Sequence, residues 1–262
     1  MPTTLEAILA STRAGLAELR ARRSELDRAA GASAAPPPFQ PALARATVAL
    51  IAEVKRRSPS AGDIQAALDP ARHAGEYAKA GAAAISVLTE GPNFGGSVED
   101  LRAVAAEVRL PLLRKDFTLD EAQIVESRAA GASAVLLIVR ALSPERLRAL
   151  REFAEGLGLD AVVEAHDERE LETALDSGAR IVGVNSRNLD TFAIDVPGAW
   201  ALLGRVPGDR IAIAESGMAT VADVERAAAA GADAVLIGTA LSRAPSPYAL
   251  AASLAGVARR VR

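Results

Sequence analysis

The sequence predicts an α/β protein: a (β/α)8 barrel, the TIM-barrel architecture, with an additional N-terminal helix. One pattern recurs four times, a glycine followed by a small residue and an apolar run, as in "KAGAAAISVLTE" and "AAGADAVLIGTA". The glycine suits the left-handed position that ends a helix, and the run after it suits a buried parallel strand. Four further strand candidates bring the total to eight, at intervals of roughly 20–35 residues, and the length of 262 residues suits such a barrel.

The remaining strand candidates lie between these repeats and are also apolar. The repeats place strands in the segments 79–90, 129–140, 176–187 and 229–240, and the other candidates are Val48–Lys55, Leu110–Asp116, Leu159–Ala165 and Ile211–Ser216. An open, doubly wound sheet is the alternative arrangement. Eight near-equal units without a sign of a switch in strand order favour a closed barrel.

Helices are predicted between the strands, because apolar residues recur there at helical spacing. Six segments show this pattern: "DPARHAGEYAKA", "VEDLRAVAAEVR", "DEAQIVESRAA", "SPERLRALREFAEGLG", "DERELETALDSG" and "TVADVERAAAAG". In the fourth segment, Ser143 suits the N-cap and Pro144 the first helical position. Strands and helices therefore alternate along the chain as βα units.

The first 44 residues stand apart from this alternation. The segment from Leu5 to about Arg28 has the pattern of an amphipathic helix, and a Pro-rich connector, "AAGASAAPPPFQPALARA", follows it. We therefore expect a helical extension with its connector over residues 1–44 and the barrel over residues 45–262. A disordered tail is the alternative, but the helical spacing of Leu and Ile favours an extra helix packed on the barrel.

The composition argues against several classes of protein. Half of the residues are apolar, which is ample for a core, and the formal net charge of -3 leaves no excess of positive charge for a nucleic-acid partner. The chain has no cysteine and only two histidines, His73 and His166, so we expect no disulfide, no thiol nucleophile and no metal site. No apolar run approaches the ~20 residues of a membrane span, and the N-terminus lacks a signal-peptide core. A cytoplasmic protein without membrane contacts is expected.

Reactive side chains of a TIM barrel gather at the carboxyl ends of its strands, and polar residues occur there in this chain. Glu53 and Lys55 lie two residues apart at the end of the first strand, so they share a face. The other polar residues near strand ends are Ser58, Lys115, Glu164, Asn185 and Arg187. For a single Lys or Glu, a solvated salt bridge is the ordinary interpretation. The six charged and amide groups, which come from four strands, instead predict a site for general acid–base catalysis.

A phosphate site is predicted beside these groups. The turns after the seventh and eighth strands, "AESG" and "LIGTAL", place Gly217, Gly238 and Thr239 where this fold binds phosphate through backbone N–H groups and a helix N-terminus. Glycine is also common in ordinary βα turns. From these two turns alone, both interpretations remain open.

These motifs resemble those of the indole-3-glycerol-phosphate synthase family, whose members close the indole ring in tryptophan biosynthesis. The matching stretches are "IAEVKRRSPSAG", "ISVLTE", "FGGS", "LPLLRKDF", "VLLIV", "VVEAHDERELETAL", "GVNSRNL", "AESGM" and "AVLIGTAL". They occur in the family's order and cover nearly everything from about Ala49 to Ser242. The combination of E-x-K-x-x-SPS with "RKDF" is highly specific for this family among phosphate-binding barrels.

The resemblance implies a reaction and the residues that carry it out. The substrate would be 1-(2-carboxyphenylamino)-1-deoxyribulose 5-phosphate, and the products indole-3-glycerol phosphate, carbon dioxide and water. Such a carboxy-lyase would need no metal and no organic cofactor. Carried onto this sequence, Lys115 is the general acid of ring closure and Glu164 the general base of dehydration. Glu53 and Lys55 assist proton transfer and positioning, and Lys55 could share the acid role.

The resemblance also implies the binding residues. Ser58, Asn185, Arg187 and Ser216 would bind and orient the substrate, with Arg187 at its carboxylate. The backbone of Gly217, Gly238 and Thr239 would hold the phosphate, and Phe94, Phe117 and Leu189 would form an apolar slot for the anthranilate ring.

Some positions depart from the family pattern. The stretch 91–93, Gly-Pro-Asn, stands where the family often has charged and aromatic residues, which leaves the mobility of that loop open. Asn188 replaces a frequent Asp, which could loosen the support of Arg187. His166 follows Glu164 where a helix begins, and we expect it to be structural or exposed.

Two other functions fit the sequence less well. Phosphoribosylanthranilate isomerase, another phosphosugar barrel, would want a carboxylate–cysteine or paired-carboxylate arrangement, whereas this chain has no cysteine and two convergent lysines. A catalytically silent barrel that binds a phosphorylated ligand would be indicated by loss of Lys115 or Glu164, and both are present. We expect a monomer that acts on a small phosphorylated substrate.

Overall fold

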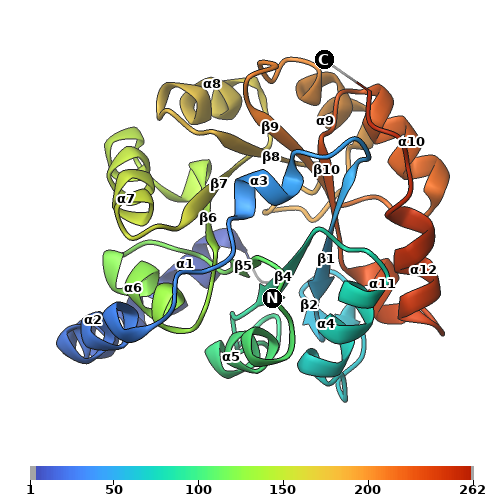
Figure 1. The fold of residues 1–262 in the computed structure, drawn as a ribbon. Coiled ribbons are helices and arrows are strands. Elements are labelled where there is room, and N and C mark those ends of the chain that lie inside the picture. Colours follow the sequence, from blue (N-terminus) through green and yellow to red (C-terminus); the bar gives the residue numbers. More distant parts are fainter. Residues whose placement is uncertain (1–3, 261–262) are drawn as a thin grey trace.

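Eight parallel strands close into a barrel, which confirms the predicted architecture (Figure 1). The computed structural model describes residues 4–260. Around the barrel the strands follow the order β1, β4, β5, β6, β7, β8, β9 and β10, and β10 pairs with β1. The sheet therefore has no free edge, in contrast to the open sheet considered as the alternative.

The strands begin and end close to the predicted residues. Those predicted with explicit bounds differ from the observed ones by at most two residues at either end. The barrel strands are β1 (Ala49–Val54), β4 (Ala84–Leu88), β5 (Leu112–Lys115), β6 (Ala134–Ile138), β7 (Asp160–Ala165), β8 (Ile181–Asn185), β9 (Ile211–Glu215) and β10 (Ala234–Ile237).

Helices follow the strands and cover the outside of the barrel (Figure 1). The six helices predicted from apolar spacing are α4 (Pro70–Lys79), α5 (Val98–Glu107), α6 (Glu121–Ala129), α7 (Pro144–Gly156), α8 (Glu168–Asp176) and α10 (Val221–Ala229). Helix α11 (Thr239–Arg243) begins at Thr239 as expected. The sequence pattern does not predict α9 (Val196–Leu203), α12 (Pro247–Leu254) or the 3-10 turn η1 (Val139–Ala141). None of the helices in residues 4–260 is both long enough and apolar enough to cross a membrane.

Short polar side chains fix where the helices begin. The hydroxyl of Ser143 accepts a hydrogen bond from the backbone N of Arg146 at 3.2 Å, and Pro144 is the first helical residue, as predicted. The same kind of cap is provided by Asp69, Ser97, Asp120, Asp167 and Thr220. Each such cap stabilises its helix by about 1 kcal/mol, because it satisfies a backbone donor that has no partner within the helix.

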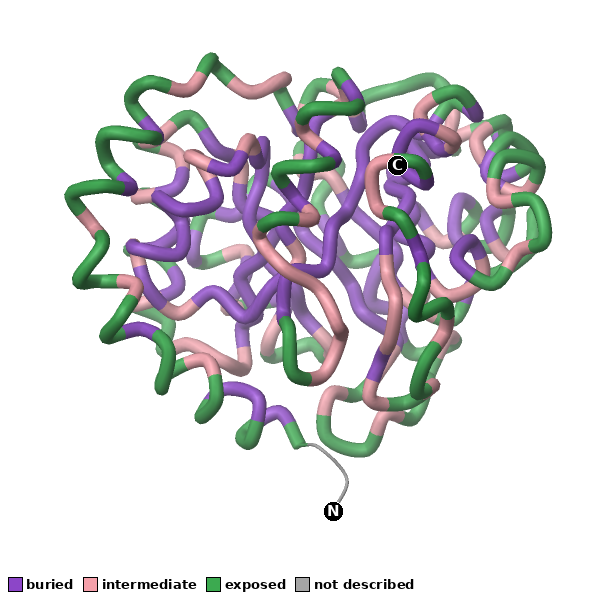
Figure 2. Tube along the Cα trace, turned by 90° about the horizontal axis from the view of Figure 1, so that it is seen from below, coloured by how far each residue is buried: buried purple, intermediate pink, exposed green. Residues whose placement is uncertain are grey.

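The core has two layers, one inside the barrel and one between the strands and the helices. Along β1, Ile51 belongs to the inner cluster, whereas Leu50 and Ala52 belong to the outer one. Figure 2 shows the buried strands at the centre, with exposed residues on the outer turns of the helices. Side chains at alternate positions of a strand point to opposite faces, so each barrel strand contributes to both layers.

The N-terminal segment differs from the single helix expected over Leu5 to Arg28. It forms two helices, α1 (Leu5–Ala21) and α2 (Arg23–Ala32), because the backbone leaves the helical conformation at Arg22, with φ -91° and ψ 6°. Helix α2 then packs against α6, with Leu26 and Ala30 buried on Val125. The predicted N-terminal helix is confirmed as α1, but it ends at Ala21 instead of about Arg28, and a second helix follows it.

The Pro-rich connector contains a further short helix, α3 (Phe39–Leu43), that closes one end of the barrel. Phe39 and Leu43 are 0% exposed and belong to the inner cluster. The backbone N of Gln40 donates to Asp160, the first residue of β7, at 2.9 Å, so this is the end where the strands begin. In Figure 1, α3 crosses in front of the barrel and α1 lies behind it.

A small hairpin after β1 is absent from the predicted elements. Its strands are β2 (Arg57–Ser58) and β3 (Gly62–Asp63), which pair antiparallel. Arg56, just before the hairpin, forms an ion pair of 2.5 Å with Asp100 of α5 and donates to the carbonyl of Leu68 at 3.1 Å. These contacts fix the loop that carries "SPS" beside the carboxyl ends of the strands.

Arg114 is buried outside β5 and organises the polar groups around it. Its guanidinium donates to Thr89, Asp116 and Glu126 at 3.0, 3.1 and 2.9 Å. The side chains of Arg114, Asp116 and Glu126 are 5, 10 and 11% exposed. Because two carboxylates share one cation in a poorly solvated place, loss of that cation would leave both without compensation.

We expect Arg114→Ala to lower the free energy of unfolding by about 3–5 kcal/mol, the usual cost of breaking a buried ion pair from one side. The measurement is denaturant unfolding followed by circular dichroism. Arg102→Ala is the control, because Arg102 pairs with Glu99 at the surface and the two side chains are 45 and 75% exposed. Equal stability of the two variants would contradict this role of Arg114.

Candidate active site

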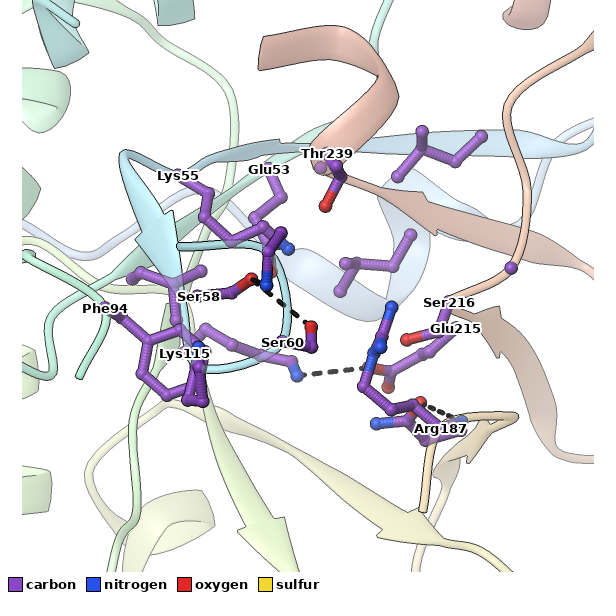
Figure 3. A pocket seen from close by; sticks show the side chains of 18 of the residues that line it. Glu53, Lys55, Ser58, Ser60, Phe94, Lys115, Arg187, Glu215, Ser216 and Thr239 are labelled. Carbon is purple, nitrogen blue, oxygen red and sulfur yellow. Dashed lines mark hydrogen bonds and ion pairs between the residues drawn. The ribbon is translucent and has the colours of Figure 1, made fainter. Parts of the chain in front are cut away.

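A cavity of about 850 Å³ lies at the carboxyl ends of the barrel strands. Every residue that the sequence predicts for the site lines it, and Figure 3 shows ten of the lining side chains with labels. The predicted residues in its wall are Glu53, Lys55, Ser58, Phe94, Lys115, Phe117, Glu164, Asn185, Arg187, Leu189, Ser216, Gly217, Gly238 and Thr239.

Alternation along the strands explains why these side chains meet. On β1, Ile51 lies in the inner cluster, and Glu53 and Lys55 continue that series by steps of two. On β5, Leu113 lies in the inner cluster and Lys115 follows two residues later. The inner face of the barrel is thus apolar in the middle and charged at the carboxyl end, where the cavity opens.

Lys115 is held between two buried carboxylates, as Figure 3 shows in part. Its Nζ lies 3.2 Å from Glu164 Oε2 and 3.2 Å from Glu215 Oε2. The side chain of Lys115 is 15% exposed, and those of both acids are 1% exposed. A carboxylate so far from water is costly without a partner, so the three groups depend on one another.

The cluster shifts the pKa values of its members in opposite directions. Burial by itself would lower the pKa of the Lys115 ammonium, but the charges of Glu164, Glu215 and Glu53 outweigh it and raise that pKa above its ordinary value. Burial raises the pKa of Glu215, and the Glu164 charge beside it raises it further. Burial by itself would raise the pKa of Glu164 as well, but Lys115 and His166 hold that pKa below its usual range. Glu164 is therefore the ionised acid of the pair.

Glu215 is central to this cluster but is not among the predicted site residues. In the sequence, "AESG" predicts a phosphate turn through its glycine, and this interpretation does not use its carboxylate. The alternation that identifies Lys115 would have found it, because Ile213 lies in the inner cluster and Glu215 follows two residues later on β9. The missed signal is therefore present in the sequence.

Two glycines leave room for the carboxylates. A Cβ on Gly238 would overlap Glu53 Oε1 and approach Lys55 Nζ, and a Cβ on Gly183 would overlap Glu215 Oε1. Glu53 Oε1 itself lies 2.8 Å from Lys55 Nζ. Gly238, predicted as part of a phosphate turn, thus also makes space for the ion pair of β1.

The loop after β4 is held by hydrogen bonds although its residues depart from the family pattern. Oε2 of Glu90 accepts from the backbone N of Asn93 and of Phe94, at 2.7 and 2.9 Å. Glu90 is buried, so these bonds are shielded from water. They place the ring of Phe94 at a centroid distance of 6.3 Å from the ring of Phe117.

The loop after β8 presents a guanidinium to the cavity. Asn185 Oδ1 accepts from the backbone N of Arg187 at 3.0 Å, and Arg187 Nη1 donates to the carbonyl of Phe192 at 3.1 Å. Asn188 accepts from two backbone N–H groups further along the loop, so it supports the turn. Among residues 4–260, no carboxylate lies within 4.0 Å of the Arg187 guanidinium, which is consequently available to a ligand.

Two turns of the cavity wall, after β9 and after β10, have the features of an anion site. Ser216 and Gly217 both have positive φ angles, 66° and 73°. This conformation is uncommon for a residue other than glycine and is often found at functional sites. The second turn, at Gly238 and Thr239, begins α11, and Lys55 lines the same cavity. Backbone N–H groups and an ammonium together favour a negative ligand.

His166 lies beside Glu164 at the end of β7. Its side chain is 4% exposed, so of the two expectations for it the structural one fits and the exposed one does not. His166 Nδ1 lies 2.9 Å from Glu170 Oε2 of α8. The contact of His166 with Glu164 could not be predicted from the sequence, where His166 is only a residue just beyond the end of a strand.

The cavity therefore combines an ammonium, an ionised carboxylate, a guanidinium without a carboxylate partner among the described residues and two turns with the features of an anion site. Such a set can protonate an oxygen, remove a proton and hold two separate negative groups of one molecule. Within residues 4–260, no three or more His, Asp and Glu side chains are arranged to hold a metal ion.

Comparison with known proteins shows the family to which the chain belongs. A sequence profile described as "Indole-3-glycerol phosphate synthase" matches residues 5–254. The chain belongs to the indole-3-glycerol phosphate synthase family. A relative of that name from Nocardioides sp. is 49% identical over 257 residues, 97% of this chain and 99% of the relative. Another from Koribacter versatilis is 47% identical over 261 residues, 98% of this chain and 100% of the relative.

A more distant likeness concerns the fold of this indole-3-glycerol phosphate synthase family member. The solved structure of thiamine phosphate pyrophosphorylase from Pyrococcus furiosus has a TM-score of 0.60 and 15% identity, covering 79% of this chain and 93% of that one. At this identity the likeness extends to the barrel architecture alone.

The raised pKa of Glu215 predicts a pH dependence of stability in this family member. Because the folded state holds a proton on Glu215 that the unfolded chain releases near its ordinary pKa of 4.5, stability from this group falls as the pH rises from that value through neutrality. We therefore expect the unfolding free energy of the wild type, relative to Glu215→Gln, to decrease over this range. The measurement is denaturant unfolding at several pH values. Glu172→Gln, an exposed position on α8, is the control and should show no trend; a rising difference for Glu215→Gln would contradict the shift.

Proposed function

We propose that this protein converts 1-(2-carboxyphenylamino)-1-deoxyribulose 5-phosphate into indole-3-glycerol phosphate, carbon dioxide and water. The observation that supports this most is the Lys115 ammonium held between the Glu164 carboxylate and the Glu215 carboxyl group in a cavity of about 850 Å³. Membership of the family supports the choice of substrate. The reaction needs an acid, a base and sites for two anionic groups, and the cavity offers all four.

Ring closure is assigned to Lys115. The aromatic carbon that carries the carboxylate attacks the ribulose carbonyl, and negative charge develops on the carbonyl oxygen. An alkoxide is far more basic than an amine, so it takes a proton even from an ammonium whose pKa is raised. The surrounding carboxylates keep Lys115 protonated at neutral pH, so the acid is ready before the substrate binds.

Decarboxylation requires that the substrate carboxylate be held until it leaves. Arg187 is suited to this role, because it is fixed through Asn185 and Phe192 and has its remaining donors free for a planar carboxylate. Phe94, Phe117 and Leu189 line the same cavity, and their apolar surfaces suit the anthranilate ring. The ring and its carboxylate would thus be bound in the same cavity.

Dehydration is assigned to Glu164 as base with a lysine as acid. The lowered pKa of Glu164 keeps it ionised, so it can take the proton from the carbon next to the amine. The departing hydroxide needs a proton, which Lys55 or Lys115 can supply. Glu53 Oε1 lies 2.8 Å from Lys55 Nζ, and both side chains line the cavity.

The phosphate is assigned to the turns after β9 and β10. Backbone N–H groups of Gly217, Gly238 and Thr239 suit its oxygens, and the hydroxyls of Ser58 and Ser216 lie in the same wall. The phosphate and the aromatic ring would then anchor the two ends of the substrate. The ribulose carbons between them would face the lysines and carboxylates.

Lys115→Met is expected to keep the fold, with a lower free energy of unfolding because Glu164 loses its buried cation, and to lose about 10²–10⁴-fold in turnover, the range for removing a general acid. Methionine keeps the apolar stem of the side chain and removes the ammonium. The measurement is the fluorescence of indole-3-glycerol phosphate formed from the carboxyphenylamino substrate. The control is Lys79→Met, because Lys79 is the last residue of α4 and lies outside the cavity. Turnover of Lys115→Met close to the wild-type value would reject Lys115 as the acid.

Glu164→Gln separates an enzyme from a barrel that only binds its ligand. The amide keeps the shape of the side chain and cannot accept the proton. We therefore expect the turnover number to fall by about 10²-fold or more, with substrate affinity nearly unchanged. Turnover at saturation and affinity for the product are both measured. If only affinity falls, Glu164 holds the ligand and the base must be sought elsewhere, with Glu53 as the next candidate.

A further inference from the structure

A second cavity, of about 520 Å³, lies next to the proposed substrate cavity. Glu164 lines the first cavity and His166 the second, whereas Asn185 lines both. The second cavity also has Asp167 and Arg205 in its wall, with side chains 58 and 47% exposed, so it reaches solvent. His166 therefore stands between a buried catalytic carboxylate and a separate opening to water.

The imidazole of His166 is held from one side. Glu170 Oε2 accepts from the backbone N of His166 at 2.8 Å and lies 2.9 Å from its Nδ1. Glu170 Oε1 in turn lies 2.7 Å from Arg140 Nε. Burial would raise the pKa of Glu170, but the bonds from His166 and Arg140 hold that pKa below its usual range, so Glu170 is ionised. An ionised carboxylate can only accept, so Nδ1 carries a hydrogen.

The other ring nitrogen points to the proposed base. His166 Nε2 lies 3.4 Å from Glu164 Oε1, is buried, and has no hydrogen-bond partner among the described residues. With Nδ1 protonated, a neutral imidazole has an acceptor at Nε2, and Glu164 Oε1 is also an acceptor. The two atoms attract each other only when a proton lies on one of them. The contact is therefore a place where a proton can be exchanged between Glu164 and the imidazole.

The proposed reaction gives such an exchange a purpose. When the new C–C bond forms, the carbonyl oxygen takes one proton; the bond to the carboxylate then breaks and its electron pair returns to the ring as carbon dioxide leaves. Loss of the hydroxyl as water takes a second proton, and the carbon next to the amine gives one proton to the base. Two protons enter the substrate and one leaves it, so the site must gain one proton from solvent in each turnover.

We propose that His166 positions Glu164 and exchanges its proton with solvent through the second cavity while the substrate fills the first. This rests on the proposed function, because it assigns a role to Glu164 as the base. Lys115, 3.2 Å from the other oxygen of Glu164, would share protons with it directly, and His166 would connect this pair to water. His166 is thus a positioning residue, which acts on the substrate only through Glu164.

The charges around His166 come from several elements. Glu164 of β7 and Glu170 of α8 face its two ring nitrogens. Arg140 of η1 binds Glu170 and lies 3.8 Å from Asp167 and 3.7 Å from Asp190. Further along the wall, Glu168 of α8 forms an ion pair with Arg205. The two ring nitrogens of His166 are thus each faced by a carboxylate.

The test is the turnover of His166→Gln and His166→Ala at saturating substrate. We expect about 10- to 100-fold lower turnover with little change in KM, at or below the low end of what a proton-transfer group contributes. In His166→Ala, added imidazole should restore turnover in proportion to its concentration, because a small base can enter from the second cavity. The wild type should not respond to imidazole.

His73→Gln is the matched control. His73 is the other histidine of the chain, is buried and also has its Nδ1 bound, to the carbonyl of Asp69 at 2.9 Å. It lies on α4, away from both cavities, and its variant should keep wild-type turnover. Wild-type turnover in both His166 variants, or a loss that imidazole does not restore, would overturn the proposal. Failure of the wild type itself to form indole-3-glycerol phosphate would instead reject the proposed function.

Discussion

One buried ammonium and the carboxylates around it are the interaction on which the rest of the site depends. Lys115 needs Glu164 and Glu215 because the barrel interior solvates an isolated cation poorly, and the acids need Lys115 for the same reason. The apolar cluster below them keeps water from relieving either charge. The pKa values of these groups are consequently shifted from their ordinary values, as is typical of groups in acid–base catalysis.

The end of β5 shows how the scaffold supports this interaction. Successive residues there point to opposite faces, so Arg114 lies outside the barrel and Lys115 inside. Arg114 binds Asp116 and Glu126 and thereby joins the strand end to the loop that follows and to α6. The strand is thus charged on both faces at its carboxyl end, with a structural network outside and a reactive group inside.

Much of the fold and the site could be predicted because both follow a short period in the sequence. A step of two residues from an apolar inner position leads to Lys115, to Glu164 and to Glu215. Glu215 is harder to recognise because its motif, "AESG", also fits a phosphate turn. The hairpin β2–β3 could not be predicted in this way, because strands of two residues show no period. The break at Arg22 depends on packing against α6, a contact between segments far apart in the sequence.

The closure of one barrel end by α3 has a consequence for how molecules reach the interior. Phe39 and Leu43 occupy the opening where the strands begin, and both are fully buried in the inner cluster. The barrel is consequently a one-ended cup, and substrate, carbon dioxide and water must share the rim at the carboxyl ends of the strands. A large ligand bound at the carboxyl ends of the strands therefore blocks the open end of the barrel. Any smaller species that must cross during catalysis then needs a passage through the wall near the rim.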